Sequence, residues 1–176
     1  MKRIVADSTA LILLAKCSFL EDVCKLFEIV IPPSVAKETA SDELIRNYPD
    51  AALIRGLMSR GLIKTEQPGV IDFHFSMSLH RGEKDALRLA LKSNEAILAT
   101  DDGKAIKAAR FLNIPFIISP KIVVNLFRLQ KMSLKKARQS IEKLGKIGRY
   151  SPEIIAESIL SLLEKEDGKA NDNKDT

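Results

Sequence analysis

The stretch ILATDDGKAIKAAR, residues 97–110, joins an apolar run to a basic, alanine-rich segment through two adjacent aspartates, Asp101 and Asp102. The apolar run is short and continuous, as is typical of a buried strand, and the residues after it have the composition of a helix. Neighbouring carboxylates repel each other, so this junction needs an explanation. Either one acid caps the helix and the other lies in a turn, or the pair belongs to a metal site.

Other segments of the chain repeat this succession of strand and helix. We predict strands at residues 2–8, 27–34, 61–69, 95–100 and 114–118. Ser8 is a plausible N-cap for the first helix, and Pro32 and Pro33 stop the second strand and open the helix after it. The pattern predicts an α/β fold of three layers, in which helices cover both faces of a parallel sheet of four to five strands.

The chain length of 176 residues suggests one domain, which we expect to span residues 1–150 and to include a basic helical part at 119–150. A C-terminal helix at 151–165 and a disordered tail at 166–176 are predicted to follow. No apolar run approaches the roughly 20 residues that a membrane span needs. The N-terminus lacks the cleavage site of a signal peptide, so we expect a cytoplasmic protein without a membrane partner.

The positive charge of the chain is concentrated near its C-terminal end. The formal net charge is +5, and residues 121–149 contain nine Lys or Arg and one acid, Glu142, for a local charge of +8. A surface that follows phosphates, a solvated helix face or a docking site for a partner would each explain this excess. Aromatic residues make up 5% of the chain and Trp is absent, so the composition does not predict recognition by base stacking.

Acidic residues from four separate segments fall at one edge of the predicted sheet, outside the carboxyl ends of the strands, where function gathers in such folds. They are Asp7, Glu38, Glu83 with Asp85, and Asp101 with Asp102. Clustered carboxylates repel unless a cation neutralises them. Oxygen ligands favour a hard cation, Mg²⁺ or Mn²⁺, and we expect His74 and His80 to be ordinary polar residues.

The helix predicted at 83–92 separates two of these acids. Glu83 aligns with apolar residues three, four and seven positions later, so its carboxylate is expected to lean over the sheet edge. Asp85 aligns instead with Arg88 and Lys92, on a more solvated side. We therefore predict that Glu83 is the inward acid and that Asp85 is second to it.

Each acid also has an ordinary structural explanation. Asp7 could cap the first helix, and Glu38 could be a solvated charge on a surface helix. Glu83 is favoured at a helix start by the helix dipole alone. Asp102 is predicted to cap the helix at 103–113 whatever else it does, and alternation along an extended strand would turn Asp101 the other way.

Taken in order, these segments resemble the PIN-domain ribonucleases, the fold also used by VapC-type toxins. The first motif, an Asp at a strand end followed by Ser, is similar to IVADSTALILLAK with Asp7 and Ser8. The second is similar to IPPSVAKETA with Glu38, and the third, Gly-Glu-x-x-Ala, to HRGEKDALRLAL. The fourth, an Asp-Asp pair before a helix, is similar to LATDDGKAIKAARFLNIPFI. The resemblance covers about residues 2–150, and SPKIVVNLFRLQKMS is similar to the helical ending of a group of archaeal and bacterial PIN proteins.

Two motifs of the family can be aligned in two registers. An Asp directly before Ala selects Asp85 in the third motif, whereas Gly-Glu selects Glu83. A Thr-x-Asp pattern selects Thr100 with Asp102 in the fourth, whereas the Asp-Asp pattern selects Asp101. The helix alignment supports Glu83, and the choice within the fourth motif stays open.

The resemblance implies an endoribonuclease dependent on Mg²⁺ or Mn²⁺ ions. The ions would be held by Asp7, Glu38, Glu83 and Asp101 or Asp102. Lys104, Lys107 and Arg110 form one stripe by their spacing of three, and would bind RNA phosphates unless they are only a solvated face. The family also implies a homodimer and, for a toxin, an antitoxin protein as partner. The alternatives are a non-catalytic module that binds RNA or protein, and a nuclease of RNA processing.

Overall fold

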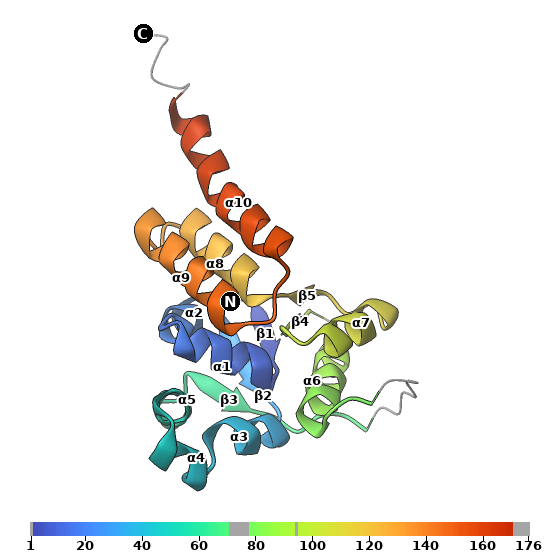
Figure 1. Ribbon diagram of the computed structural model, residues 1–176. Helices are drawn as coiled ribbons and strands as arrows, with labels where there is room; N and C mark the ends of the chain where they lie inside the picture. Colours follow the sequence, from blue (N-terminus) through green and yellow to red (C-terminus); the bar gives the residue numbers. More distant parts are fainter. Residues whose placement is uncertain (1, 71–77, 94, 171–176) are drawn as a thin grey trace. The chain divides into compact units, whose positions relative to one another are not determined.

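Five parallel strands form one sheet in the order β3-β2-β1-β4-β5 (Figure 1). The computed structural model of the chain describes residues 2–70, 78–93 and 95–170. The strands are β1 (Arg3–Ala6), β2 (Glu28–Ile31), β3 (Ile63–Thr65), β4 (Ile97–Ala99) and β5 (Phe116–Ile117). Each lies inside its predicted range, and each is shorter because the flanking residues enter loops and helix caps. The predicted parallel α/β sheet is confirmed.

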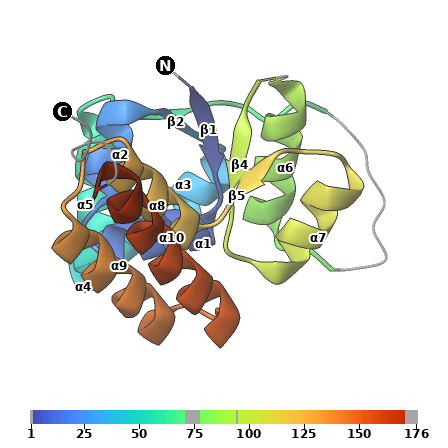
Figure 2. The same ribbon diagram turned by 90° about the horizontal axis from the view of Figure 1, so that it is seen from above.

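Helices cover both faces of this sheet, which confirms the three-layer arrangement. They are α1 (Ser8–Lys16), α2 (Leu20–Leu26), α3 (Pro33–Ala40), α4 (Asp42–Asn47), α5 (Pro49–Ser59), α6 (Arg81–Lys92) and α7 (Gly103–Phe111). Helices α6 and α7 lie on one side of the sheet, and α1, α2 and α5 on the other (Figures 1 and 2). The connecting helices move to the other face of the sheet where the strand order reverses between β1 and β4. Right-handed crossovers require this change of face.

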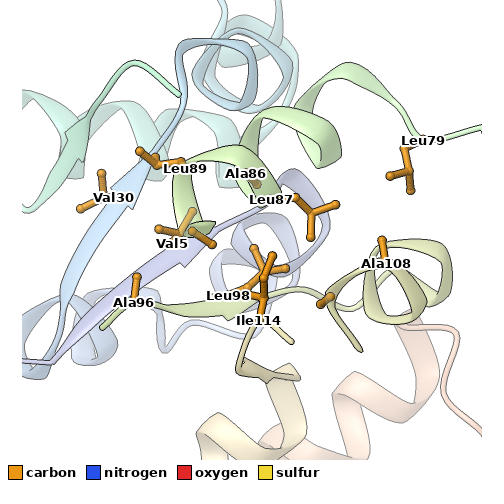
Figure 3. Close-up of a cluster of buried hydrophobic side chains, with 12 residues drawn as sticks. Val5, Val30, Leu79, Ala86, Leu87, Leu89, Ala96, Leu98, Ala108 and Ile114 are labelled. Atoms are coloured by element: carbon orange, nitrogen blue, oxygen red, sulfur yellow. The ribbon is translucent and has the colours of Figure 1, made fainter. Parts of the chain in front are cut away.

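The core beneath α6 is built on a row of strand residues in register. Val5 pairs with Val30 on one side and with Leu98 on the other, so the three side chains share one face of the sheet. The buried residues packed around them come chiefly from α6 and α7, and they include Ala86, Leu87, Leu89 and Ala108 (Figure 3). Full burial of each large side chain contributes roughly 1.5–3 kcal/mol. This packing holds the start of α6 beside the sheet edge.

The chain divides into two compact units, Met1–Ile118 and Ser119–Thr176. The second contains α8 (Ser119–Arg128), α9 (Leu134–Ile147) and α10 (Pro152–Ala170), each packed on the other two. The three helices are separated at residues 129–133 and 148–151. The division falls where the basic helical part was expected to begin, because α8 and α9 pack with α10.

Helix α10 also differs from the expectation at its end. It continues to Ala170, so residues 166–170 of the expected disordered tail are helical, since extending a formed helix costs little. Residues 171–176 lie outside the described part of the chain. No helix in the described ranges combines the length and the apolar composition needed to cross a membrane.

Candidate functional site

The candidate site lies at the carboxyl ends of β1 and β4, the two neighbouring strands between which the strand order reverses. Loops diverge from such a point to opposite faces of the sheet and leave a crevice between them. The backbone N–H of Asp7 donates to the carbonyl of Ala99 at 3.0 Å, so the ends of the two strands are locked together. The first and fourth predicted motifs therefore meet here.

Asp7 is the most buried acid of the site, with 1% of its surface exposed. One carboxylate oxygen accepts hydrogen bonds from the Ala10 backbone N–H at 2.9 Å and from the Thr9 hydroxyl at 2.7 Å. The other accepts one from the Thr100 hydroxyl. Asp7 thus caps α1, so of the two caps that the sequence offered, Asp7 and Ser8, the structure has Asp7. The extended backbone conformation belongs to Asp7, and Ser8 is already the first helical residue.

The surroundings of Asp7 strongly disfavour its charged form. Burial raises the pKa of its carboxyl from 3.8 to about 7, and the neighbouring charge of Asp101 adds to the rise. The hydrogen bonds from Ala10, Thr100 and Thr9 act in the opposite direction but do not compensate for burial. An acid whose pKa is shifted to near neutrality beside a pocket is a candidate for a functional site.

The two adjacent acids Asp101 and Asp102 have different roles. Strand β4 ends at Ala99, one residue before the predicted end at residue 100, so Asp101 and Asp102 both lie beyond the strand. Asp102 caps α7, because one of its oxygens accepts from the backbone N–H groups of Lys104 at 2.8 Å and Ala105 at 2.9 Å. The predicted cap is confirmed. Its own N–H donates to the Thr100 hydroxyl at 3.2 Å, which ties the cap to the Asp7 network.

Asp101 stands on the Asp7 side of the pair. Its backbone N–H donates to the Thr9 hydroxyl at 3.3 Å, the same hydroxyl that donates to Asp7. Its carboxylate is near enough to Asp7 to raise the pKa of that residue. Of the two adjacent acids, Asp101 is therefore the one whose charge acts on the buried carboxyl.

A pocket of about 400 Å³ adjoins this network and contains two more of the predicted acids. We call it the strand-end pocket; its lining residues are Ser8, Thr9, Glu38, His80 and Glu83. One oxygen of Glu38 accepts from the Ser8 hydroxyl, and the other accepts from the Gly82 backbone N–H at 3.0 Å. Glu38 is thereby fixed between the starts of α1 and α6.

Gly82 leaves room for this close approach. A Cβ atom at this position would lie 2.9 Å from the carboxyl carbon of Glu38 and 3.0 Å from one of its oxygens. Any larger residue would push the carboxylate aside. The glycine before Glu83 in the third motif therefore allows the start of α6 to reach the Glu38 carboxylate.

His80 and Glu83 cap the start of α6 reciprocally. The His80 backbone N–H donates to the Glu83 carboxylate at 2.9 Å, and the His80 side chain accepts from the Glu83 backbone N–H. His80 was expected to be an ordinary polar residue, and sequence reasoning missed its place in the pocket. The signal was its position three residues before an acid, the spacing of a capping box. His74 lies outside the described residues.

The position of Asp85 on α6 differs from the prediction. Like Glu83 it is only 8% exposed, so its expected position on a more solvated side was wrong. Arg88 and Arg81 fold over it, with nitrogen–oxygen distances of 3.3 Å and 3.8 Å. The column predicted for Glu83 is confirmed, because the apolar residues below it are buried. Asp85 thus has its own basic partners, and Glu83 lines the pocket.

The acids are oxygen donors of the kind that Mg²⁺ and Mn²⁺ prefer, but they do not surround one point. Within the described ranges, no three acidic, histidine or cysteine side chains are grouped closely enough to hold one ion. Asp7 and Asp101 share the Thr9 network, whereas Glu38 and Glu83 share the strand-end pocket. The donor set fits a hard cation in its chemistry, and the side chains would have to turn to enclose one.

The predicted basic stripe lies on α7, the helix that Asp102 caps. Lys104, Lys107 and Arg110 are all exposed. The Lys104 ammonium donates to the Ser78 carbonyl at 3.3 Å, and the Arg110 guanidinium lies 5.5 Å from the centre of the Phe116 ring. The stripe has the predicted exposure, and its contact with RNA stays a prediction.

Comparison with known proteins gives one family. A family model described as DUF3368, a PIN domain, matches residues 3–165. No curated protein matches the sequence. Among solved structures, the chain is similar to a domain of a functionally unknown protein from Methanocaldococcus jannaschii DSM 2661, at 22% sequence identity and a TM-score of 0.45. The alignment covers 67% of this chain and 91% of that one.

Proposed function

The chain belongs to the PIN-domain family, whose members are generally nucleases, and from this premise we propose that it is an endoribonuclease dependent on a divalent metal ion. One observation carries the proposal beyond family membership. Asp7 is fully buried at the point where the strand order reverses, with a pKa of about 7, and no Lys or Arg forms an ion pair with it among the described residues. A cation from outside the chain would stabilise its charged form.

Asp7, Glu38, Glu83 and Asp101 are the residues that would hold Mg²⁺ or Mn²⁺. When bound, such an ion would lower the pKa of a water molecule and stabilise negative charge on the attacked phosphate. The protein supplies oriented ligands. The hydroxyls of Thr9 and Thr100 fix the Asp7 carboxylate. Loss of a group that orients a ligand in this way typically lowers metal affinity or activity about 10- to 100-fold.

The stripe of Lys104, Lys107 and Arg110 supports RNA as the substrate. Carboxylates repel phosphates, so basic side chains are needed to bring the phosphate backbone to an acidic pocket. These three lie on the helix that begins directly after the acid pair, and their exposed side chains are available to a ligand. We propose that they bind the phosphates next to the cleaved bond.

A non-catalytic binding module is the second candidate, and the separation of the acids into two subsets favours it. In that case the pocket would hold no metal ion and the basic residues alone would bind a partner. The roles of toxin or RNA-processing nuclease, an antitoxin partner and a homodimer stay predictions from the resemblance to VapC-type proteins.

The two buried acids of α6 make a matched pair for testing the proposal. Glu83 and Asp85 are equally exposed, but only Glu83 lines the pocket. With labelled single-stranded RNA and Mn²⁺, we expect wild type and Asp85→Asn to cleave and Glu83→Gln to lose cleavage. A chelator should stop all cleavage. Equal cleavage by Glu83→Gln and wild type, or cleavage that survives the chelator, would overturn the proposal.

A further inference from the structure

Helix α9 exposes a continuous basic surface, which we call the α9 face; it consists of Lys135, Lys136, Arg138, Lys143 and Lys146. All five side chains are exposed, whereas Ala137, Ser140, Ile141 and Leu144 are buried on the opposite side. The helix therefore divides cleanly into a packed side and a basic side. Five of the nine Lys and Arg residues of 121–149 lie on this one surface.

The charges of the α9 face are arranged in rows along the helix. Lys136, Lys143 and Lys146 follow one row at spacings of seven and three, with exposed Gln139 between the first two and no acid among them. The row spans about 15 Å, the rise of ten helical residues. The one acid of α9, Glu142, lies four residues before Lys146 and is paired with Arg138 at 2.9 Å. The lysine row thus presents three cations in line.

We propose that the α9 face binds the phosphate backbone of RNA, as a second contact surface for the substrate of the proposed nuclease. This inference rests on the proposed function for the identity of the nucleic acid. Lysines in a row match a polyanion whose charges recur at short, regular intervals. The exposed side of α9 contains no aromatic residue to stack on a base, so binding depends on charge and not on sequence.

The packing of α9 argues against a lipid surface as the partner. A helix that binds membranes buries its apolar side among the lipids. The apolar side of α9 is already covered within the unit of α8, α9 and α10. At Gly145 a Cβ atom would lie 3.3 Å from the Ile155 side chain of α10, so α9 and α10 are in close contact. The basic side is the exposed one.

The test compares two triple variants with the same loss of charge. The α9 variant removes the charges of the lysine row by Lys136→Gln, Lys143→Gln and Lys146→Gln. The control variant removes three exposed lysines of the first unit by Lys16→Gln, Lys25→Gln and Lys64→Gln. Binding to a labelled 30-nucleotide RNA is measured in chelator between 50 and 200 mM salt, so that no cleavage is needed. We expect the α9 variant to bind at least about tenfold more weakly, and its salt slope to fall by about 2 to 3.

A reverse variant and a second ligand complete the experiment. Glu142→Gln removes the acid of the helix and should strengthen binding several-fold. Equal affinities for the two triple variants would overturn the proposal, as would binding to vesicles of anionic lipid without binding to RNA. Because binding is read without metal, loss of cleavage in the Glu83→Gln test does not affect this result, and a failure here leaves the nuclease proposal standing.

Discussion

The acids that line two pockets of the first unit have different kinds of partner. A pocket of about 970 Å³ lies beside the first residues of β1, β2 and β4, and we call it the strand-start pocket. Two of its three acids have basic partners, since Glu66 pairs with Arg3 and Glu28 pairs with Lys64 at 2.7 Å, and the third, Glu95, is exposed. In the strand-end pocket, Glu38 and Glu83 accept hydrogen bonds only from uncharged groups within the described residues.

The difference also appears in the pKa values. The hydrogen bond from Lys64 lowers the pKa of Glu28, whereas burial raises the pKa of Asp7, beside the strand-end pocket, to about 7. The charge of an acid with a basic partner is neutralised within the folded chain. Acids that accept hydrogen bonds only from hydroxyls and amides have no basic side chain to stabilise their charged form, and a cation from solution can do so. The comparison therefore identifies the strand-end pocket, and not the larger one, as the place for a metal ion.

The largest expected effect is a pH dependence of stability caused by Asp7. Its pKa is higher in the folded chain than the ordinary 3.8, so the folded state holds a proton more tightly between pH 4 and 7. The free energy of unfolding should fall across this window as pH rises, by up to about 4 kcal/mol. Urea unfolding in chelator measures it. Asp7→Asn should largely remove the fall, and an equal fall in both proteins would contradict the assigned burial.

The same substitution should abolish the chemistry. Asn preserves the cap of α1 and can still hydrogen-bond to Thr9 and Thr100, but it carries no charge for a cation. We expect Mn²⁺-dependent cleavage of RNA to fall at least about 100-fold. The melting temperature at pH 7 should not fall. A fully active Asp7→Asn protein would remove the buried acid from the proposed site.

Gly82→Ala should separate activity from stability. The added Cβ displaces the Glu38 carboxylate, while alanine gains helix propensity of roughly 1 kcal/mol over glycine. Cleavage is expected to fall about 10- to 100-fold with a melting temperature at or above that of wild type. If activity and melting temperature are both unchanged, the contact between Gly82 and Glu38 has no role in the site.

The smallest effect is expected in the strand-start pocket. Glu28→Gln breaks an ion pair with Lys64 that is partly exposed, so the free energy of unfolding should change by no more than about 1 kcal/mol. Cleavage should equal that of wild type. A loss of cleavage comparable to that of Gly82→Ala would mean that the two pockets do not differ in function as their partners indicate.

Local patterns in the sequence predicted the features that depend on periodicity. Short, continuous apolar segments that take turns with helical ones predicted the parallel sheet. Helix spacing predicted the buried column under Glu83, and the junction after β4 predicted the cap at Asp102. These follow from neighbours within a few residues. Asp7 and Ser8, by contrast, are both good caps in adjacent positions, and only the backbone conformation selects Asp7.

The features that the sequence missed depend on contacts between distant segments. The Thr100 hydroxyl reaches Asp7 because β1 and β4 are neighbours in the sheet, and the Gly82 N–H reaches Glu38 because α6 begins beside α3. Burial of Asp85 depends on how two arginine side chains fold, which helix spacing alone does not determine. The acids predicted to lie together at one sheet edge therefore form two sets with different hydrogen-bond partners, Asp7 with Asp101 and Glu38 with Glu83.

Metal binding to a crystal tests the central claim most directly. Crystals soaked in millimolar Mn²⁺ would be measured at a wavelength where manganese scatters anomalously. The account predicts a peak among the carboxylates of Asp7, Glu38, Glu83 and Asp101, and none in the strand-start pocket. Absence of a peak at the strand end, or a peak only beside the paired acids Glu28 and Glu66, would contradict it.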